Sequence, residues 1–469
     1  MRTIVDCSQR GEGINAYIPA NFHRGKHWVL TLPTTDIIVA RIVETRKCYP
    51  GQKILMWKTD YGRYYRNFFL DPCQVPYFAI EVDGEVYLDC AFSFGNRGAA
   101  NCAQRTSWAI SHIFNTRVPP FPGSHNTGSS CSCLQRCKCG ENSSDPYIDD
   151  VVGLSPQPMA ALQYQSFIEL SEHLGVPLSR TPGHLCPPSR QCVALGILFD
   201  LDENSVSLPE DKLVEYLALL LDWLGKTTAT YRQLSSLAGK LLYASRVIRP
   251  GRIFLNRILR TKTRSSTFSR PIILDRSFMA DVKWWHQSLV ATNGICFLEP
   301  EFTAEVSLDA SSSGWFGGIP GLGGFNHQTG EYFACAPPTF ALDWHISDLE
   351  LVAHLVAARL WGPHWAGAYI LGHTDNQACF DLVSRGKSQI DQRLRMARTL
   401  ASLQVNGKYI WVSTWVPTAD NVLADALSRL GQPGALELFN GVCECLGVVP
   451  SRLEVSPDMF SFEPDPGRR

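Results

Sequence analysis

Tyr147-Ile148-Asp149-Asp150 is the stretch on which the interpretation of this sequence depends, and Val151-Val152-Gly153 follows it directly. The pattern predicts strand, tight turn and strand, with the two aspartates at the tip. Adjacent carboxylates repel each other, so a site that uses both needs a compensating cation. Mg²⁺ suits this role because it takes oxygen ligands and keeps phosphates and waters in its shell. The same dipeptide also fits a solvated turn or a helix cap, so its context must decide.

Composition indicates a folding, core-forming chain. The sequence has 469 residues, of which 45% are hydrophobic and 19% charged, and its net charge is −1. This length predicts roughly two to four domains. The 16 scattered cysteines and the absence of a secretory leader predict a reduced intracellular protein of cytoplasm or nucleus. No apolar run reaches the length of a membrane span, so we expect no membrane partner.

A third aspartate follows a predicted strand. Residues 53–59 are mostly apolar and predict a strand that ends at Asp60, after which comes a turn rich in Arg and Tyr. A carboxylate at a strand end is well placed to bind a metal ion, and the neighbouring cations and aromatic rings suit phosphates and stacked bases. Taken alone, Asp60 is better explained as an ordinary strand-end residue.

Two segments between these aspartates carry local structural signals. Residues 79–89 alternate around Asp83-Gly84, which strongly predicts a hairpin. The loop at Phe94-Gly95 opens a predicted helix that ends near Phe114. Its glycines allow the backbone to approach a ligand closely, and a helix N-terminus favours phosphate.

Residues 117–146 are rich in Pro, Gly, Ser and Cys, which predicts an exposed insertion. Four thiolates inside it could bind Zn²⁺, although their spacing differs from the paired CxxC of most zinc sites. A cysteine-rich loop without metal is the alternative. The four residues are Cys131, Cys133, Cys137 and Cys139.

The segment from Trp223 to Leu274 contains eleven Lys and Arg and no Asp or Glu. Helices are predicted over about 208–223 and 230–247, so these cations lie mainly on the second helix and beyond it. A solvated basic face would explain them, but the absence of acids favours a track along a phosphate backbone. The track comprises Arg232, Lys240, Arg246, Arg249, Arg252, Arg257, Arg260, Lys262 and Arg264.

The last third of the chain carries four more carboxylates on predicted strands and helices. Strands are predicted over 306–311, 369–375 and 409–417, and helices over about 347–360 and 421–429. Four acids in the order Asp, Glu, Asp, Asp on such a unit suit a two-metal nuclease. Each acid alone also fits a cap or a surface position. The four are Asp309, Glu350, Asp375 and Asp425.

Together these residues resemble a reverse transcriptase followed by a ribonuclease H domain, over nearly the whole chain. Asp60 matches the first catalytic aspartate of the polymerase palm, and Tyr147-Ile148-Asp149-Asp150 matches the aromatic-x-Asp-Asp signature. Residues 249–252 and 423–429 are most similar to retroelements of the DIRS type, which pair such a polymerase with a tyrosine recombinase. The resemblance implies catalysis and metal binding by Asp60, Asp149 and Asp150.

The resemblance also implies roles in substrate binding. It assigns an aromatic gate against a ribose 2′-hydroxyl, a loop at template and nucleotide, a fingers arginine at the triphosphate and a primer-grip turn. The implied nucleotide-binding residues are Arg2, Tyr65, Phe94 and Gly95. The implied nucleic-acid-binding residues are Leu195 and Gly196 of the primer grip, with Arg232, Lys240, Arg246, Arg249 and Arg252.

In the C-terminal part, Asp309, Glu350, Asp375 and Asp425 match the catalytic and metal-binding carboxylates of ribonuclease H. The resemblance implies two Mg²⁺ ions in each active site, with Mn²⁺ as an alternative. It implies an RNA template, a DNA or RNA primer, deoxynucleoside triphosphates and an RNA–DNA hybrid as partners. Other products of the same element are further candidate partners.

The sequence departs from the family pattern in three places. We expect the chain to begin inside the fingers, so that the basic hairpin strand before Arg2 is missing. The palm motif that usually offers a lysine as general acid has none. By spacing back from Leu195-Gly196, which lies in a predicted strand over 193–199, His184 falls at its place and could donate a proton to pyrophosphate. Trp415 replaces the ribonuclease H histidine, which should slow product release.

We therefore predict an α+β chain: a right-hand polymerase palm and thumb with truncated fingers, followed by an α/β ribonuclease H-like domain. The expected segments are fingers and palm over 1–207, a basic helical thumb or connection over 208–300, a ribonuclease H-like domain over 301–432 and a tail over 433–469. We expect the tail to be loose from about Ser451.

The predicted function is RNA-directed DNA synthesis with hybrid cleavage, in a protein of a retrotransposon. Two alternatives remain open. The chain could be an inactive, N-terminally truncated remnant that binds nucleic acid, or it could be active only as a ribonuclease H. Duplex binding without metal-dependent turnover favours the remnant, and hybrid cleavage without synthesis favours the second alternative.

Overall fold

A computed structural model describes residues 15, 32–96, 98–117, 143–265, 271–291, 293–297, 303–386, 388 and 390–463. Arg2 and the four cysteines of the predicted zinc site lie outside this part. The described chain forms two compact units, Met1–Pro209 with Cys296–Leu298 and Glu210–Ile295 with Glu299–Arg469. The predicted α+β class is confirmed, and the finer division into four segments remains a prediction. None of the described helices is both long and apolar enough to cross a membrane.

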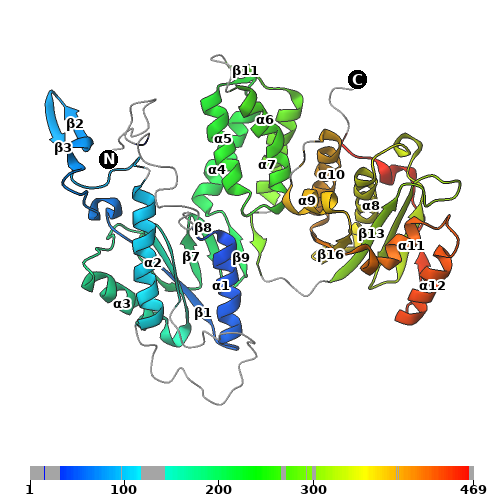
Figure 1. Cartoon of the computed structure of the whole chain (residues 1–469), viewed down its shortest axis with the longest axis horizontal. Helices are drawn as coiled ribbons and strands as arrows, with labels where there is room; N and C mark the ends of the chain where they lie inside the picture. The colour runs from blue at the N-terminus through cyan, green and yellow to red at the C-terminus, as the bar shows by residue number, and fades with distance from the viewer. Residues whose placement is uncertain are drawn as a thin grey trace. The chain divides into compact units, whose positions relative to one another are not determined.

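The first unit is built on an antiparallel sheet in the order β4-β5-β1-β6 (Figure 1). Its strands are β1 (Ile54–Asp60), β4 (Ser144–Tyr147), β5 (Asp150–Pro156) and β6 (Cys186–Ser189). Helices α1 (Thr35–Cys48), α2 (Ala99–Arg117) and α3 (Gln157–His173) pack on these strands. Strand β4 pairs with β5, so the predicted insertion extended too far: its last residues belong to the sheet.

The core of this sheet forms around Trp57 of β1, which is fully buried. Its indole ring packs against Phe114 of α2 and Phe167 of α3. Gly153 lies opposite Trp57 in the β1–β5 register, and a Cβ at that position would overlap the indole ring. The glycine after the paired aspartates therefore makes room for the core.

Two hairpins complete the first unit. The predicted hairpin over 79–89 is confirmed as β2 (Ala79–Val82) and β3 (Glu85–Leu88). The single strand predicted over 193–199 is wrong, because Leu195 and Gly196 have φ values of 50° and 71° and turn the chain back. This turn joins two strands of a second sheet, whose order is β12-β9-β8-β7. The strands are β7 (Gln191–Ala194), β8 (Ile197–Asp200), β9 (Ser205–Ser207) and β12 (Ile295–Cys296).

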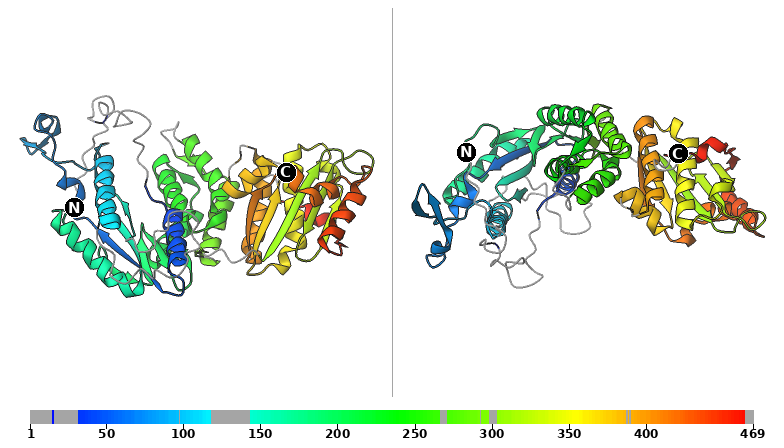
Figure 2. Two further views of the ribbon diagram at one scale, coloured as in Figure 1. Left: turned by 60° about the horizontal axis from the view of Figure 1, so that its bottom comes forward. Right: turned by 90° about the horizontal axis from the view of Figure 1, so that it is seen from above.

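The second unit begins with four helices that pack side by side (Figures 1 and 2). They are α4 (Glu210–Leu224), α5 (Tyr231–Ala244), α6 (Asn256–Ser265) and α7 (Arg276–Ala291), with a 3₁₀ segment, η5 (Arg249–Leu255), before α6. Short strands β10 (Thr228–Ala229) and β11 (Ile272–Ile273) pair beside them. Thr230 begins α5 as a capping box with Gln233, which satisfies backbone donors at the helix start.

The rest of the second unit is a six-stranded mixed sheet in the order β17-β16-β13-β14-β15-β18. Strands β13, β14 and β15 are antiparallel, whereas β16 runs parallel to β13 and β17 parallel to β16. The strands are β13 (Ala304–Ser311), β14 (Gly321–Asn326), β15 (Glu331–Cys335), β16 (Tyr369–Thr374), β17 (Ile410–Trp415) and β18 (Ser451–Arg452). This arrangement and its helices form a ribonuclease H-like fold.

Helices surround this sheet on both faces. They are α8 (Ile346–Leu360), α9 (Gln377–Arg385), α10 (Asp391–Gly407), α11 (Val422–Ser428) and α12 (Ala435–Leu446). On one face, Gly323 allows α11 to approach closely, because a Cβ there would lie 2.5 Å from the Ala424 carbonyl oxygen. The sheet side chains alternate, so Gly324 faces the other way, toward Phe333. Phe333 in turn packs against Trp361, which follows α8.

The prediction of a loose tail from about Ser451 is wrong. Residues Ser451–Arg452 pair with the edge strand β15, and the 3₁₀ segment η9 (Pro457–Phe460) packs on α8. Glu463 then reaches the buried Arg257 of α6, with 2.9 Å between Oε1 and Nη1. Arg257 also pairs with Asp281 of α7, and Arg398 of α10 pairs with the same aspartate. The last described residues are thus held by ion pairs that span three helices.

Candidate active sites

The paired strands β1 and β5 bring the first set of predicted acids together. Asp60 ends β1 and lies opposite Asp150, which begins β5. The carbonyl oxygen of Asp149 accepts a 2.9 Å hydrogen bond from the Tyr61 amide. Burial, with the nearby carboxylates of Asp149 and Asp150, raises the pKa of Asp60 to about 6. These three acids therefore share one partly buried, electrostatically coupled site.

The turn that presents Asp149 is strained. Ile148 has a φ of 55°, a left-handed conformation that is unfavourable for a β-branched residue. Two side chains of α2 hold it: the Ile148 amide donates to Gln104 Oε1, and the Ile148 carbonyl accepts from Ser107 Oγ, each at 2.5 Å. Strain of this kind persists only where the surroundings impose it, and it is concentrated at functional sites.

Two basic side chains, Lys58 and His184, face the same acids. Lys58 Nζ lies 3.1 Å from Asp150 Oδ1, and His184 Nδ1 lies 3.0 Å from Asp60 Oδ1. Burial disfavours the charge on Lys58, but the adjacent Asp150 holds the pKa of the Lys58 ammonium above its ordinary value. His184 thus lies in the site, as its predicted position suggested, and its role as a proton donor remains a prediction.

The predicted nucleotide-binding residues Tyr65 and Phe94 lie beside each other, with ring centroids 5.0 Å apart. Burial and the neighbouring Asp149 carboxylate raise the pKa of the Tyr65 phenol. Gly95 has a φ of 102°, and its carbonyl accepts a 2.8 Å hydrogen bond from Asn15 Nδ2. Tyr65 therefore contacts Phe94 and lies near the Asp149 carboxylate. Arg2 lies outside the described residues.

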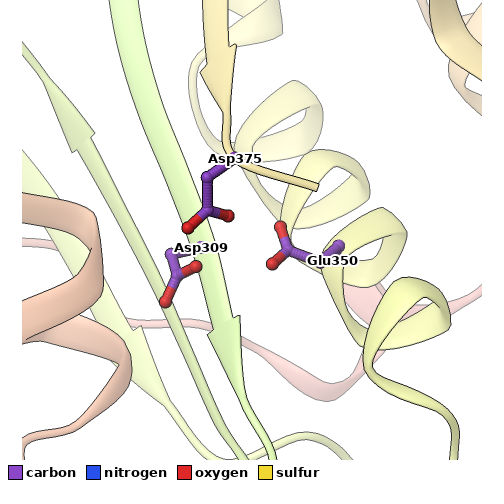
Figure 3. Close-up of side chains that lie close together, drawn as sticks. All are labelled: Asp309, Glu350 and Asp375. Atoms are coloured by element: carbon purple, nitrogen blue, oxygen red, sulfur yellow. The ribbon is translucent and has the colours of Figure 1, made fainter. Parts of the chain in front are cut away.

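The C-terminal sheet brings three of the four later acids together. Asp309 lies on β13, Glu350 on α8, and Asp375 directly follows β16. Their carboxyl groups point toward one another (Figure 3), and one oxygen of each lies within 4.8 Å of those of the other two. Within the described ranges, this is the only group of three or more His, Cys, Asp or Glu with such convergent ligand atoms.

This triad has the properties of a divalent-cation site. Burial, with Asp375 and Asp425 nearby, raises the pKa of Asp309 to about 7, and burial beside Asp309 and Asp375 raises the pKa of Glu350. Glu350 Oε2 is buried and meets no hydrogen-bond donor in the described part of the chain. Mg²⁺ and Mn²⁺ prefer oxygen ligands, and a bound cation would relieve the repulsion between the three carboxylates. The residues therefore fit the implied ions.

The fourth acid, Asp425, lies on α11 outside this convergent group. Its Oδ1 accepts a 2.7 Å hydrogen bond from Arg429 Nε, one helical turn later. Ser428 Oγ, on the same helix, donates a 2.6 Å hydrogen bond to Asp309 Oδ2. Helix α11 therefore contacts the triad through Ser428 and holds its own carboxylate with Arg429.

Asp375 is fixed by the segment that follows β17. Trp415 Nε1 donates a 2.9 Å hydrogen bond to the Asp375 carbonyl, and Thr418 Oγ1 donates a 2.6 Å hydrogen bond to Asp375 Oδ2. The residue that replaces the expected histidine therefore contacts the backbone of a predicted metal ligand. Its effect on product release remains a prediction.

The predicted basic track is only partly exposed. Arg232, Arg246 and Arg252 are exposed, and the side chain of Arg249 is not described. Lys240 Nζ lies 2.6 Å from Glu215 of α4, so it has an anionic partner from outside the acid-free segment. Arg257 is buried against Asp281 and does not belong to an exposed track, because the fold uses its charge internally.

Several residues of these sites were missed from the sequence. Lys58 lies two positions before Asp60, and alternation along a strand places both on one face. Ser428 and Arg429 follow Asp425 by three and four positions, which is neighbour spacing on a helix. These signals were available locally. Gln104 and Ser107 gave none, because their contacts with Ile148 depend on how α2 packs.

No protein-family model matches the sequence, and no curated protein sequence matches it. A structure of the foamy viral protease-reverse transcriptase dRH in complex with double-stranded DNA is similar, with a TM-score of 0.46 and 11% identity. The match covers 88% of this chain and 62% of that one, so the chain spans less than two thirds of the viral protein's length.

A second comparison concerns the C-terminal part. The crystal structure of RNase H1 from the halophilic archaeon Halobacterium salinarum NRC-1 matches 29% of this chain and 97% of its own length. Its TM-score is 0.22 and its identity is 20%. At these scores, the fold assignment rests on the strand orders and registers described above, and the similarity adds no residue roles.

Proposed function

We propose that this chain is an RNA-directed DNA polymerase with an associated ribonuclease H activity, from a retrotransposon of the DIRS type. The observation that carries the proposal is the convergence of Asp309, Glu350 and Asp375 on a ribonuclease H-like sheet. A separate palm-like sheet in the same chain places Asp60 opposite Asp150. Two distinct carboxylate sites suit synthesis and cleavage of the same nucleic acid.

In the first site, Asp60, Asp149 and Asp150 would hold two Mg²⁺ ions, which when bound activate the primer hydroxyl and neutralise the triphosphate. Tyr65 would contact the sugar of the incoming nucleotide and Phe94 the template, since their rings contact each other near Asp149. His184, in contact with Asp60, is the proposed proton donor to pyrophosphate. The Leu195-Gly196 turn would contact the primer.

In the second site, Asp309, Glu350 and Asp375 would hold the ions together with Asp425, and the RNA strand of a hybrid would be cut. Discrimination between RNA and DNA would rest on 2′-hydroxyl contacts and groove shape. The exposed cations of α5 and η5 would bind phosphates without reading sequence. Template, primer and deoxynucleoside triphosphates are the proposed further partners.

A primer-extension assay on 5′-labelled RNA with Mg²⁺ tests both activities in one tube. We expect Asp149→Asn to abolish synthesis and leave cleavage intact, and Asp375→Asn to do the reverse. Asp222→Asn is the matched control, because Asp222 is exposed on α4 and pairs with Lys226. Synthesis by Asp149→Asn at the unsubstituted rate would contradict the assignment of the palm site.

Activity as a ribonuclease H alone is the second candidate, and one observation favours it. The only convergent metal-ligand group within the described residues is the C-terminal triad, whereas the palm acids contact Lys58 and His184. Cut RNA without DNA product would support this candidate. Duplex binding with neither product would instead support a non-catalytic nucleic-acid-binding protein.

A further inference from the structure

An arginine, Arg429, lies beside the fourth acid of the C-terminal site. Arg429 Nε donates to Asp425 Oδ1 at 2.7 Å, one turn apart on α11. This hydrogen bond uses Nε alone, and the side chain is 39% exposed. The terminal nitrogens of Arg429 make no hydrogen bond to the described residues. The guanidinium is therefore oriented by one carboxylate and remains open to solvent.

This pairing explains why the fourth acid is separate from the other three. Asp309, Glu350 and Asp375 converge, but Asp425 is not a member of the group. Asp425 is nevertheless close enough to act on the charge of Asp309. Arg429 likewise lies within electrostatic reach of Asp309 and Asp375. Asp425 thus lies beside the triad with its charge balanced by its own helix neighbour.

We propose that Arg429 is a positioning residue: its hydrogen bond restrains the Asp425 carboxylate beside the triad. This restraint lowers the affinity of the site for divalent cations. The inference deepens the proposed function and rests on it for the identity of the site. Its chemistry is electrostatic. Binding of a divalent ion is weakened by any cation at the site and strengthened by any carboxylate that is free to turn toward it.

Arginine suits this task better than lysine would. Its planar group directs Nε toward one carboxylate in a fixed orientation, and it stays charged at every physiological pH. An ammonium would keep the charge but lose that direction. Removal of the charge would free Asp425 to add an oxygen ligand. The two substitutions therefore separate the hydrogen bond from the charge.

The test is direct binding of Mn²⁺ to the full chain at neutral pH. The electron paramagnetic resonance signal of the free ion measures how much Mn²⁺ remains unbound. We expect Arg429→Gln to tighten Mn²⁺ binding by roughly three- to tenfold, mainly because the Asp425 carboxylate is then free to turn toward the ion. Arg429→Lys should give a smaller gain of about twofold, because the ammonium still pairs with Asp425 but no longer fixes its direction. Thermal unfolding of each variant verifies that it is folded.

A double substitution shows whether the effect passes through Asp425. If it does, Arg429→Gln should tighten binding much less when Asp425 is already Asn, because no carboxylate is released. A full gain in the Asp425→Asn background would overturn the proposal, since Arg429 would then act by its field alone. Unchanged or weaker Mn²⁺ binding by folded Arg429→Gln would overturn it as well.

Arg452→Gln is the matched control. Arg452 lies on β18, three strands from β13, and donates to the Ala334 carbonyl. Its loss should not alter Mn²⁺ binding. Hybrid cleavage is measured in parallel, which separates the two hypotheses. Absence of cleavage by the unsubstituted chain would count against the proposed function, while the Mn²⁺ titrations would still decide the role of Arg429.

Discussion

Ser428 donates a 2.6 Å hydrogen bond to Asp309 across 119 positions of sequence. Both side chains are buried, so the bond is protected from water. A hydrogen bond to a carboxylate favours its charged form and opposes the effect of burial. Ser428 therefore makes Asp309 easier to ionise, and hence easier to use as a ligand, than burial alone would allow.

Ser428→Ala should shift the pH profile of hybrid cleavage upward, by several tenths of a unit to about one unit. The pKa of Asp309, already raised to about 7 by burial, would rise further without this bond. The measurement is the cleavage rate from acid to alkaline pH at fixed Mg²⁺. Ser413→Ala is the control, because Ser413 is buried on β17 and its Oγ makes no hydrogen bond to the described residues. An identical profile for Ser428→Ala and the unsubstituted chain would contradict the expectation.

Metal-free protein should lose stability as the pH rises toward neutrality. The folded state raises the pKa of Asp309 from its ordinary value of 3.8 to about 7, so protonation of this acid favours folding. Its contribution is complete below the unfolded pKa and is lost as the pH rises through the folded one, with a total on the order of a few kcal/mol. Urea unfolding at several pH values measures it.

The same experiment has two internal checks. Asp309→Asn should remove most of this pH dependence, since the amide does not titrate. Mn²⁺ or Mg²⁺ should raise the unfolding midpoint more in alkaline than in acid buffer, because metal and proton compete for the same oxygens. A stability curve that rises steadily between acid and neutral pH in the metal-free chain would speak against the buried triad.

Gln104→Ala should loosen the turn that presents Asp149. The substitution leaves the Ile148 amide without its 2.5 Å acceptor, at a cost of roughly 1–3 kcal/mol. Primer extension should fall while hybrid cleavage is retained, because only the first site depends on this turn. Thermal unfolding and primer extension measure the two effects. Gln165→Ala on α3 is the control, since Gln165 is exposed and bonds only Glu169 in the described chain.

Two glycine substitutions should have opposite effects on stability. Gly153→Ala places a Cβ inside the ring of the buried Trp57, and we expect a loss of roughly 3 kcal/mol or more. Gly239→Ala has open space around the new Cβ and lies within α5, so it should stabilise by up to about 1 kcal/mol. Urea unfolding of both variants measures the difference. Comparable stability of the two would contradict the packing of Trp57 against β5.

Arg246→Gln and Arg252→Gln should each weaken duplex binding and lower its salt dependence by about one unit of log–log slope. Arg257→Gln should instead lower the free energy of unfolding, because Arg257 is buried against Asp281. Binding titrations at several salt concentrations distinguish the two classes. Arg452→Gln, on the far edge strand, should leave the slope unchanged. Equal slopes for all four variants would remove the proposed phosphate track.

Part of both candidate sites could be predicted from sequence, because several of the acids lie at the ends of apolar segments. Asp60 ends a predicted strand and Asp375 follows β16 directly, and the position of Asp149 and Asp150 at a hairpin tip follows from short-range pattern. What the sequence could not give is register. The opposition of Asp60 and Asp150 depends on how β1 and β5 align, and no local signal specifies that.

The wrong predictions also depend on contacts between residues that are distant in the sequence. Arg257 was grouped with exposed cations because its partner Asp281 lies on another helix, and Lys240 because Glu215 precedes the acid-free segment. The tail was expected to be loose because its composition is rich in proline. Its order comes from contacts with α8, α10 and β15 that only the folded chain supplies.

The ion pairs around Asp281 limit how the second unit can move. Two arginines and two acids, Arg257, Arg398, Asp281 and Glu463, balance one another where water has little access. Any hinge between α6 or α7 and α10 would have to separate buried opposite charges, which costs several kcal/mol. The helical segment and the ribonuclease H-like sheet should therefore move as one rigid body. If the helices bind a duplex, as proposed, the carboxylate triad would then meet it at a fixed distance from the helices.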